Sequence, residues 1–183
     1  MAVIKTRNMH RPNILGLFSD MEISLNNFNI TNAEDLLQRA NIIHFPVDLN
    51  IITELLGLRI IRESLTDGIS GILDIANNSI VVEERHPLQR QNFTIAHEIA
   101  HFCLHRNEEN RFQDKIFFRG AENNTLEYQA NEFAGALLMP EDEFFNQIRS
   151  GNKTIEGLAR YFGVSTLAVR VRAQNLHLTG HKL

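Results

Sequence analysis

One stretch constrains the fold of this 183-residue chain more than any other: residues 93–105, which read Phe-Thr-Ile-Ala-His-Glu-Ile-Ala-His-Phe-Cys-Leu-His. Its apolar residues fall nearly all round the helix that it predicts, which is typical of a helix packed inside a domain. Residues four apart lie one above the other on a helix, so His97 and His101 direct two imidazoles to one point in space. Buried imidazoles need polar partners, and a metal ion would supply one.

The pattern His97-Glu98-x-x-His101 matches a zinc site in which the glutamate moves protons for a water at the metal. The pattern is short, and a chain with 8 histidines can contain it by chance. A zinc site also needs a third protein ligand. We expect that ligand to come from a separate helix with its own apolar face.

Residues 127–140 provide such a helix. Glu127 lies at the end of a stripe of otherwise core-facing residues, which makes it the candidate third ligand. Asn131 lies one turn further on, where it can hydrogen-bond a ligand side chain. Glu132 points away from Glu127 and is the weaker candidate. The alternative for Glu127 is a solvated charge at the start of a helix.

Two further residues of the first helix invite a metal-binding role. Cys103 lies about 200° round the helix from His101, so a buried, unreactive side chain is the favoured interpretation. His105 continues the four-residue spacing but lies about 6 Å further along the axis. We therefore expect His105 at the surface or in contact with a ligand, and not as a ligand itself.

Together the two segments resemble the ImmA/IrrE family of zinc metallopeptidases. Phe-Thr-Ile-Ala-His-Glu-Ile-Ala-His is followed by Glu-x-x-Ala-Asn-x-Phe-Ala-x-x-Leu-Leu-Met-Pro, and the resemblance covers residues 33–178. It implies His97, His101 and Glu127 as ligands of Zn²⁺ and Glu98 as the catalytic base. Several members cleave a helix-turn-helix repressor, and others are encoded beside an antitoxin-like regulator.

Upstream of the histidine helix, the pattern predicts a small antiparallel sheet. Residues 58–63, 70–75 and 79–83 are strand-like, and Asn77-Asn78 is a suitable hairpin turn. The expected fold is therefore α+β, a zincin-like metalloprotease domain. In that architecture an edge strand aligns an extended substrate, and we expect strand 70–75 or 79–83 in this role. A sheet that only covers the core is the alternative.

Residues 106–125 are mostly polar and predict a loop that lines a cleft. Phe117 and Phe118 are candidates for receiving an apolar substrate side chain, although pinning the loop to the core is the favoured interpretation. Arg119 is a candidate for stabilising negative charge on a substrate oxygen, and Tyr128 or a histidine elsewhere in the chain is an alternative.

The C-terminal part predicts a helix-turn-helix-like unit. Ala159, Gly163 and Val169 hold the small, turning and core-filling positions that such a unit needs. Residues 149–183 carry a net charge of +5, which leaves −9 for the rest of the chain. Arg170 and Arg172 are therefore candidates for docking DNA or a partner. They diverge on a helix, so structural packing is favoured over DNA binding.

These segments define an expected domain organisation: an N-terminal extension (1–30), the metallopeptidase domain (31–150) and the C-terminal unit packed on it (151–183). The single cysteine indicates a reducing, cytoplasmic location. There is no apolar run of about 18 residues, so no membrane span is expected.

The function expected from the sequence is a zinc-dependent endopeptidase with a helix-turn-helix transcriptional repressor as its substrate. The alternative is a toxin or regulator that binds an Xre-type antitoxin repressor with little or no proteolysis.

Overall fold

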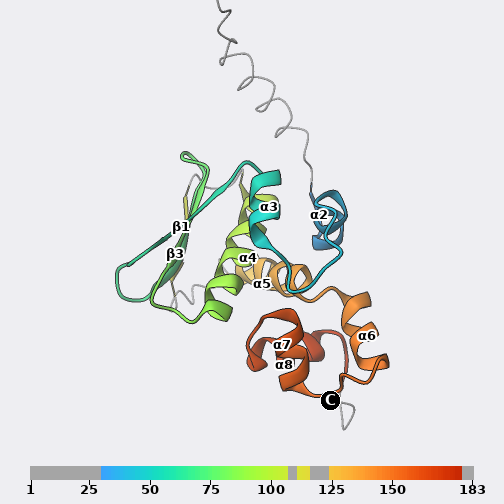
Figure 1. The fold of residues 1–183 in the computed structure, drawn as a ribbon. Helices are drawn as coiled ribbons and strands as arrows, with labels where there is room; N and C mark the ends of the chain where they lie inside the picture. Colours follow the sequence, from blue (N-terminus) through green and yellow to red (C-terminus); the bar gives the residue numbers. More distant parts are fainter. Residues whose placement is uncertain (1–29, 107–110, 116–123, 179–183) are drawn as a thin grey trace, which may run out of the picture.

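The computed structural model describes residues 30–106, 111–115 and 124–178, and these form an α+β fold (Figure 1). The helices are α2 (Ala33–Arg39), α3 (Leu49–Leu55), α4 (Leu88–His105), α5 (Asn124–Leu138), α6 (Glu141–Arg149), α7 (Ile155–Phe162) and α8 (Thr166–Asn175). The strands are β1 (Arg59–Glu63), β2 (Ile69–Asp74), β3 (Ser79–Glu83) and β4 (Arg111–Lys115).

The four strands form one mixed sheet in the order β1-β3-β2-β4. β2 pairs antiparallel with β3 and with β4, whereas β1 pairs parallel with β3, in the register Arg59↔Ser79. The turn between β2 and β3 lies at Asn77-Asn78, as expected, and Asn78 adopts a φ of 48°. The Asp74 carboxylate closes this turn by accepting from the Asn77 amide at 3.1 Å.

Three expectations about the sheet were wrong. It is not purely antiparallel, because β1 lies beside β3 and runs in the same direction. Strands β2 and β3 are interior strands, so neither offers a free edge, and the edges are β1 and β4. β4 itself lies inside the segment interpreted as a loop. Alternation of side chains tells which face of a strand is buried but not which strand lies beside it.

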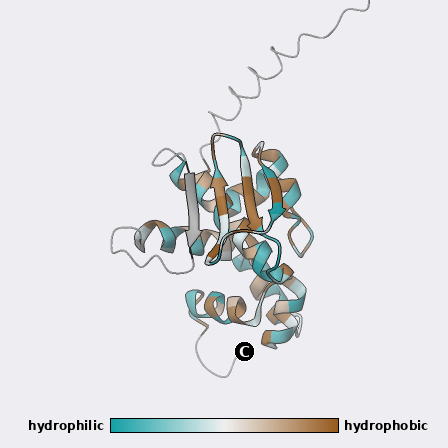
Figure 2. Cartoon of the chain, turned by 90° about the vertical axis from the view of Figure 1, so that its left-hand side faces the viewer, coloured by the Kyte–Doolittle hydropathy of each residue, from teal (hydrophilic) through white to brown (hydrophobic). Residues whose placement is uncertain are grey.

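Helix α4 lies between the sheet and α5, and this layering positions the site (Figure 1). The central strands β2 and β3 are mostly buried, whereas β1 is mostly exposed, and hydrophobic residues run along both central strands (Figure 2). Ile80, Val82 and Leu73 are fully buried there. On α4 the apolar residues Ile95, Ala96, Ile99 and Ala100 are all 0% exposed, as expected for a helix covered on every side.

The C-terminal helices pack against the segment that joins α2 and α3. Gly163 ends α7 with a φ of 66°, and a β-carbon at this position would lie 3.0 Å from the Pro46 ring. Phe45 contacts the rings of Tyr161 and Phe162. Ser165 caps α8 by accepting from the Ala168 amide at 3.1 Å. Two helices joined by a tight glycine turn are thus fastened to the body of the protein.

Within the described part of the chain, no helix is long and apolar enough to cross a membrane.

Candidate metal centre

Helix α4 carries two of the candidate ligands near its middle. It begins after Pro87, whose fixed φ suits the start of a helix, and it continues without a break to His105. His97 and His101 are 3% and 2% exposed. Their Nε2 atoms lie 3.0 Å apart, so the four-residue spacing directs both imidazoles to one point.

Helix α5 brings Glu127 to the same point. Ala130 and Ala134, both 0% exposed, let α5 lie close along α4. Glu127 Oε2 lies 3.2 Å from His97 Nε2, and Glu127 Oε1 lies 3.4 Å from His101 Nε2. These three residues form the group of potential metal ligands among the described residues.

Both imidazoles also have a polar contact on their other nitrogen. His97 Nδ1 lies 3.1 Å from Asn131 Oδ1, at the position expected from the sequence. His101 Nδ1 lies 3.0 Å from His105 Nδ1, and His105 Nε2 lies 3.0 Å from Gln129 Oε1. His105 is 2% exposed, so it is a buried neighbour of a candidate ligand and does not lie at the surface.

The local electrostatics shift His101 and Glu127 toward the forms that bind a cation. Burial lowers the pKa of His101, although the nearby Glu127 carboxylate acts in the opposite direction. Hydrogen bonds from His101 and His97 lower the pKa of Glu127 well below its ordinary value. A neutral imidazole and an ionised carboxylate both offer lone pairs.

Glu98 lies on the side of α4 that faces the sheet, and it is 0% exposed. It is held against Gly71 of β2: a β-carbon at position 71 would lie 2.9 Å from Glu98 Oε1 and would overlap the Thr94 methyl group. Glycine at this position therefore lets the strand and the helix approach each other next to the carboxylate. Neither Gly71 nor Thr94 was singled out from the sequence, which carries no signal for this contact.

Burial raises the pKa of the Cys103 thiol to about 12, and its sulfur does not belong to the group of potential metal ligands found among the described residues. The Glu132 carboxylate accepts a hydrogen bond from the Asn175 side chain and is turned toward α8, away from the ligand group.

The remaining candidate residues are distributed as follows. Arg170 is exposed on α8. Arg172 is 9% exposed, and its Nε donates to the carbonyl of Met139 at 2.9 Å, so it fastens α8 to the end of α5 and does not face a DNA groove. Phe117, Phe118 and Arg119 lie outside the described residues.

Fold and site together define a class of protein: an α+β domain in which a buried His-Glu-x-x-His helix and a carboxylate from a second helix form a group that could hold a metal ion. Residues 53–174 match the family described as the IrrE N-terminal-like domain, Peptidase_M78. The match covers more than half of the chain, which therefore belongs to this family of metallopeptidase type.

The fold is also similar to that of a solved structure, a Mycobacterium tuberculosis transcriptional regulator. The TM-score is 0.61 at 21% sequence identity, and the match covers 78% of this chain and 45% of that one. The chain thus spans less than half the length of that regulator, and an identity this low supports the fold alone. No curated protein matches the chain significantly.

Proposed function

We propose that the chain is a zinc-dependent endopeptidase that cleaves a protein substrate, with a helix-turn-helix transcriptional repressor as the substrate class. The observation that carries this proposal is the triangle formed by His97 Nε2, His101 Nε2 and the Glu127 carboxylate, with edges of 3.0, 3.2 and 3.4 Å. Tetrahedral ligands about 2.0–2.1 Å from a zinc ion lie about 3.3 Å from one another. Two imidazoles and one carboxylate are also a ligand set typical of catalytic zinc.

A zinc ion held by these residues supplies Lewis-acid chemistry, because it lowers the pKa of a coordinated water and polarises a carbonyl group. In this proposal the Glu98 carboxylate accepts the proton of the attacking water and returns it to the leaving amine. Glu98 lies on the same helix as the two histidines, and its carboxylate packs closely against Gly71 of β2. The proposed arrangement is zincin-like.

The sheet supports a polypeptide as the substrate. β4 is an edge strand next to β2, and β2 is the strand that packs against Glu98. An extended substrate that adds to this edge would be aligned by main-chain hydrogen bonds. The repressor is the finer part of the proposal, supported by the resemblance to peptidases that cleave such regulators.

The test is the Glu98→Gln variant, with Glu132→Gln as the matched control. Each protein, loaded with one equivalent of zinc, is mixed with a helix-turn-helix repressor encoded beside its gene, and fragments are identified by mass spectrometry. We expect Glu98→Gln to bind zinc normally but not to cleave, and Glu132→Gln to cleave like the unchanged protein. Cleavage by Glu98→Gln at the unchanged rate would remove Glu98 from its role.

One observation favours a second candidate, a regulator that binds an Xre-type antitoxin repressor without cutting it. His97, Glu98 and His101 are all nearly or fully buried, so three of the four residues of the centre are closed off from solvent, and only Glu127, whose side chain is 38% exposed, is partly open. Closed metal sites are typical of structural zinc. This candidate predicts that Glu98→Gln keeps full biological activity and that the repressor is bound intact.

A further inference from the structure

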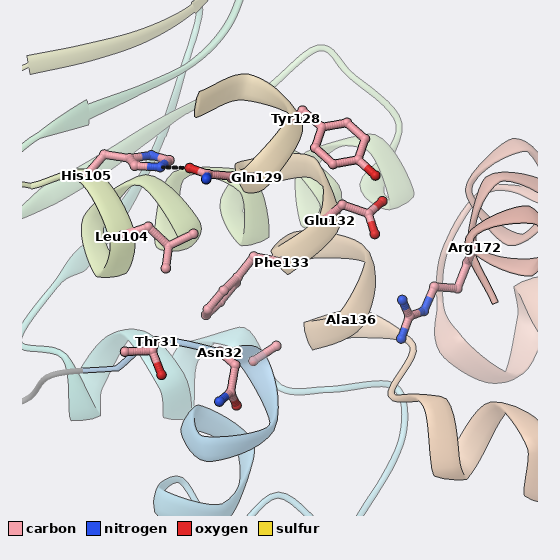
Figure 3. A pocket seen from close by; sticks show the side chains of 11 residues that line it. Thr31, Asn32, Leu104, His105, Tyr128, Gln129, Glu132, Phe133, Ala136 and Arg172 are labelled. Atoms are coloured by element: carbon pink, nitrogen blue, oxygen red, sulfur yellow. Dashed lines mark hydrogen bonds between the residues drawn. The ribbon is translucent and has the colours of Figure 1, made fainter. Parts of the chain in front are cut away.

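The two imidazoles of the metal centre are oriented by the same helix, α5, but by different routes. Asn131 contacts His97 directly, through its Oδ1 atom at 3.1 Å from His97 Nδ1. The route from Gln129 to His101 passes through His105. Gln129 Oε1 lies 3.0 Å from His105 Nε2 (Figure 3). His105 Nδ1 in turn lies 3.0 Å from His101 Nδ1.

The position of each proton in this series of contacts follows from the place where His97, His101 and Glu127 would bind an ion. His101 directs Nε2 toward His97 and Glu127, so this nitrogen must keep its lone pair to bind a cation. A neutral imidazole has one N–H, which must then be on Nδ1 of His101 and donate to His105 Nδ1. His105 consequently has its own N–H on Nε2, which donates to Gln129 Oε1.

We propose that His105 is a positioning residue. Gln129 Oε1 accepts the N–H of His105, so His105 Nδ1 is left to accept the N–H of His101 and holds His101 in its metal-binding tautomer. The inference rests on the proposed metal site but not on hydrolysis. In metal sites generally, a partner on the second nitrogen of a ligating histidine fixes the tautomer and the ring orientation. Here that partner is itself a histidine, which has to be oriented in turn.

The surroundings of His105 fit this role. At 2% exposure, its polar atoms depend on protein partners on both sides. Gln129 is exposed and lines a pocket of about 580 Å³ together with His105, Glu132 and Arg172 (Figure 3). This series of contacts thus leads from the buried histidines of the candidate metal centre to the exposed side chain of Gln129.

The first experiment compares His105→Leu with His105→Asn. Leucine fills a similar volume without a hydrogen-bond acceptor. Asparagine has its acceptor oxygen, Oδ1, bonded to Cγ, which is where histidine has Nδ1. Zinc affinity is measured by competition with a chelator, and the unfolding midpoint of the metal-free protein is measured in parallel. Cys103→Ala, on the same helical turn, is the control for packing.

We expect His105→Leu to lose about 10–100-fold in zinc affinity and His105→Asn to lose less than about tenfold. Cys103→Ala should keep the original affinity. The proposal is overturned if His105→Leu binds zinc as tightly as the unchanged protein, or if His105→Asn falls as far as His105→Leu. A purely structural role would lower the unfolding midpoint of the metal-free variants without this order of affinities.

A second measurement needs no variant. In the zinc-loaded protein, long-range ¹⁵N–¹H correlation spectra distinguish the two tautomers of each histidine. We expect His105 with its proton on Nε2, and a proton on Nδ1 of His105 would overturn the inference even if the variants failed to fold. Normal zinc binding without cleavage of any repressor would contradict the proposed function alone and leave this inference standing.

Discussion

Gly71 of β2 faces the carboxylate of Glu98 on α4 so closely that a β-carbon at position 71 would lie 2.9 Å from Glu98 Oε1. The same atom would overlap the methyl group of Thr94. The strand and the helix therefore meet at a glycine at the place where the candidate base is buried. The sheet and α4 approach each other closely at this contact.

The first prediction concerns this contact. Gly71→Ala should force β2 away from α4, with a loss of about 1–3 kcal/mol in the free energy of unfolding, as expected for overpacking. Cleavage should fall more than zinc affinity, because the Glu98 side chain packs against β2, whereas the imidazoles of His97 and His101 face α5. Denaturant unfolding and chelator competition measure the two effects. The control is Gly135→Ala on α5, where the nearest atom would be 3.9 Å away, and alanine there should stabilise by about 0.5–1 kcal/mol.

The second prediction concerns the third ligand. Glu127→Gln keeps the shape of the side chain but removes the charge, so zinc affinity should fall by more than the 10–100-fold typical of losing an outer-shell partner. Glu132→Gln should leave zinc affinity unchanged, because Glu132 is turned toward Asn175. Chelator competition on both variants measures the difference. Equal losses would show that Glu127 is not a ligand.

Asn131 provides the third prediction. Because its Oδ1 atom contacts His97 Nδ1 at 3.1 Å, Asn131→Leu should weaken zinc binding by about 10–100-fold. Asn131→Asp retains an acceptor and should keep most of the affinity. A loss of the same size in both variants would mean that the side chain acts through packing and not through its acceptor oxygen.

The fourth prediction concerns acid stability at the end of β3. Hydrogen bonds from the Arg85 side chain and amide lower the pKa of Glu83 from 4.5 to about 2. A lowered pKa in the folded state stabilises the protein above the unfolded pKa, and this stabilisation is lost as the pH falls. The unfolding midpoint of the unchanged protein should therefore approach that of Glu83→Gln between pH 4.5 and 2. A difference between the two that stays constant over this range would contradict the prediction.

The fifth prediction separates the two arginines of α8. Arg172→Met removes a buried donor to the Met139 carbonyl and should cost about 1–3 kcal/mol of stability. Arg170→Met, at an exposed position, should change stability by less than about 0.5 kcal/mol. Thermal unfolding of both variants measures this. If Arg170→Met were the more destabilising of the two, the structural role assigned to Arg172 would be wrong.

Helical periodicity was the most reliable basis for predicting the candidate site from the sequence. The spacing of His97 and His101 is a local property of one helix, so it predicts which way the imidazoles point before any tertiary contact is known. Glu127 and Asn131 follow from the same rule on a second helix, and the structure places both beside the histidines. Family membership was also confirmed by a match over residues 53–174, a range that includes both segments.

The sheet shows where this reasoning ends. Strand β4 and the parallel pairing of β1 with β3 were missed, because the partner of a strand is chosen by packing between segments far apart in the chain. Arg172 was a candidate for docking because of its charge, with structural packing favoured, and its burial against the end of α5 shows which contact it makes.

From its sequence alone this protein has a helix that offers two imidazoles and a carboxylate, because the geometry of a helix is the same in every fold. Tertiary structure decided the rest: that α5 lies close enough to complete the ligand group, that Gly71 bounds Glu98, and that His105 connects His101 to Gln129. The first two contacts join residues on different elements, and the third depends on Gln129 of α5, which lies against His105. They exist only because the core brings the sheet, α4 and α5 together.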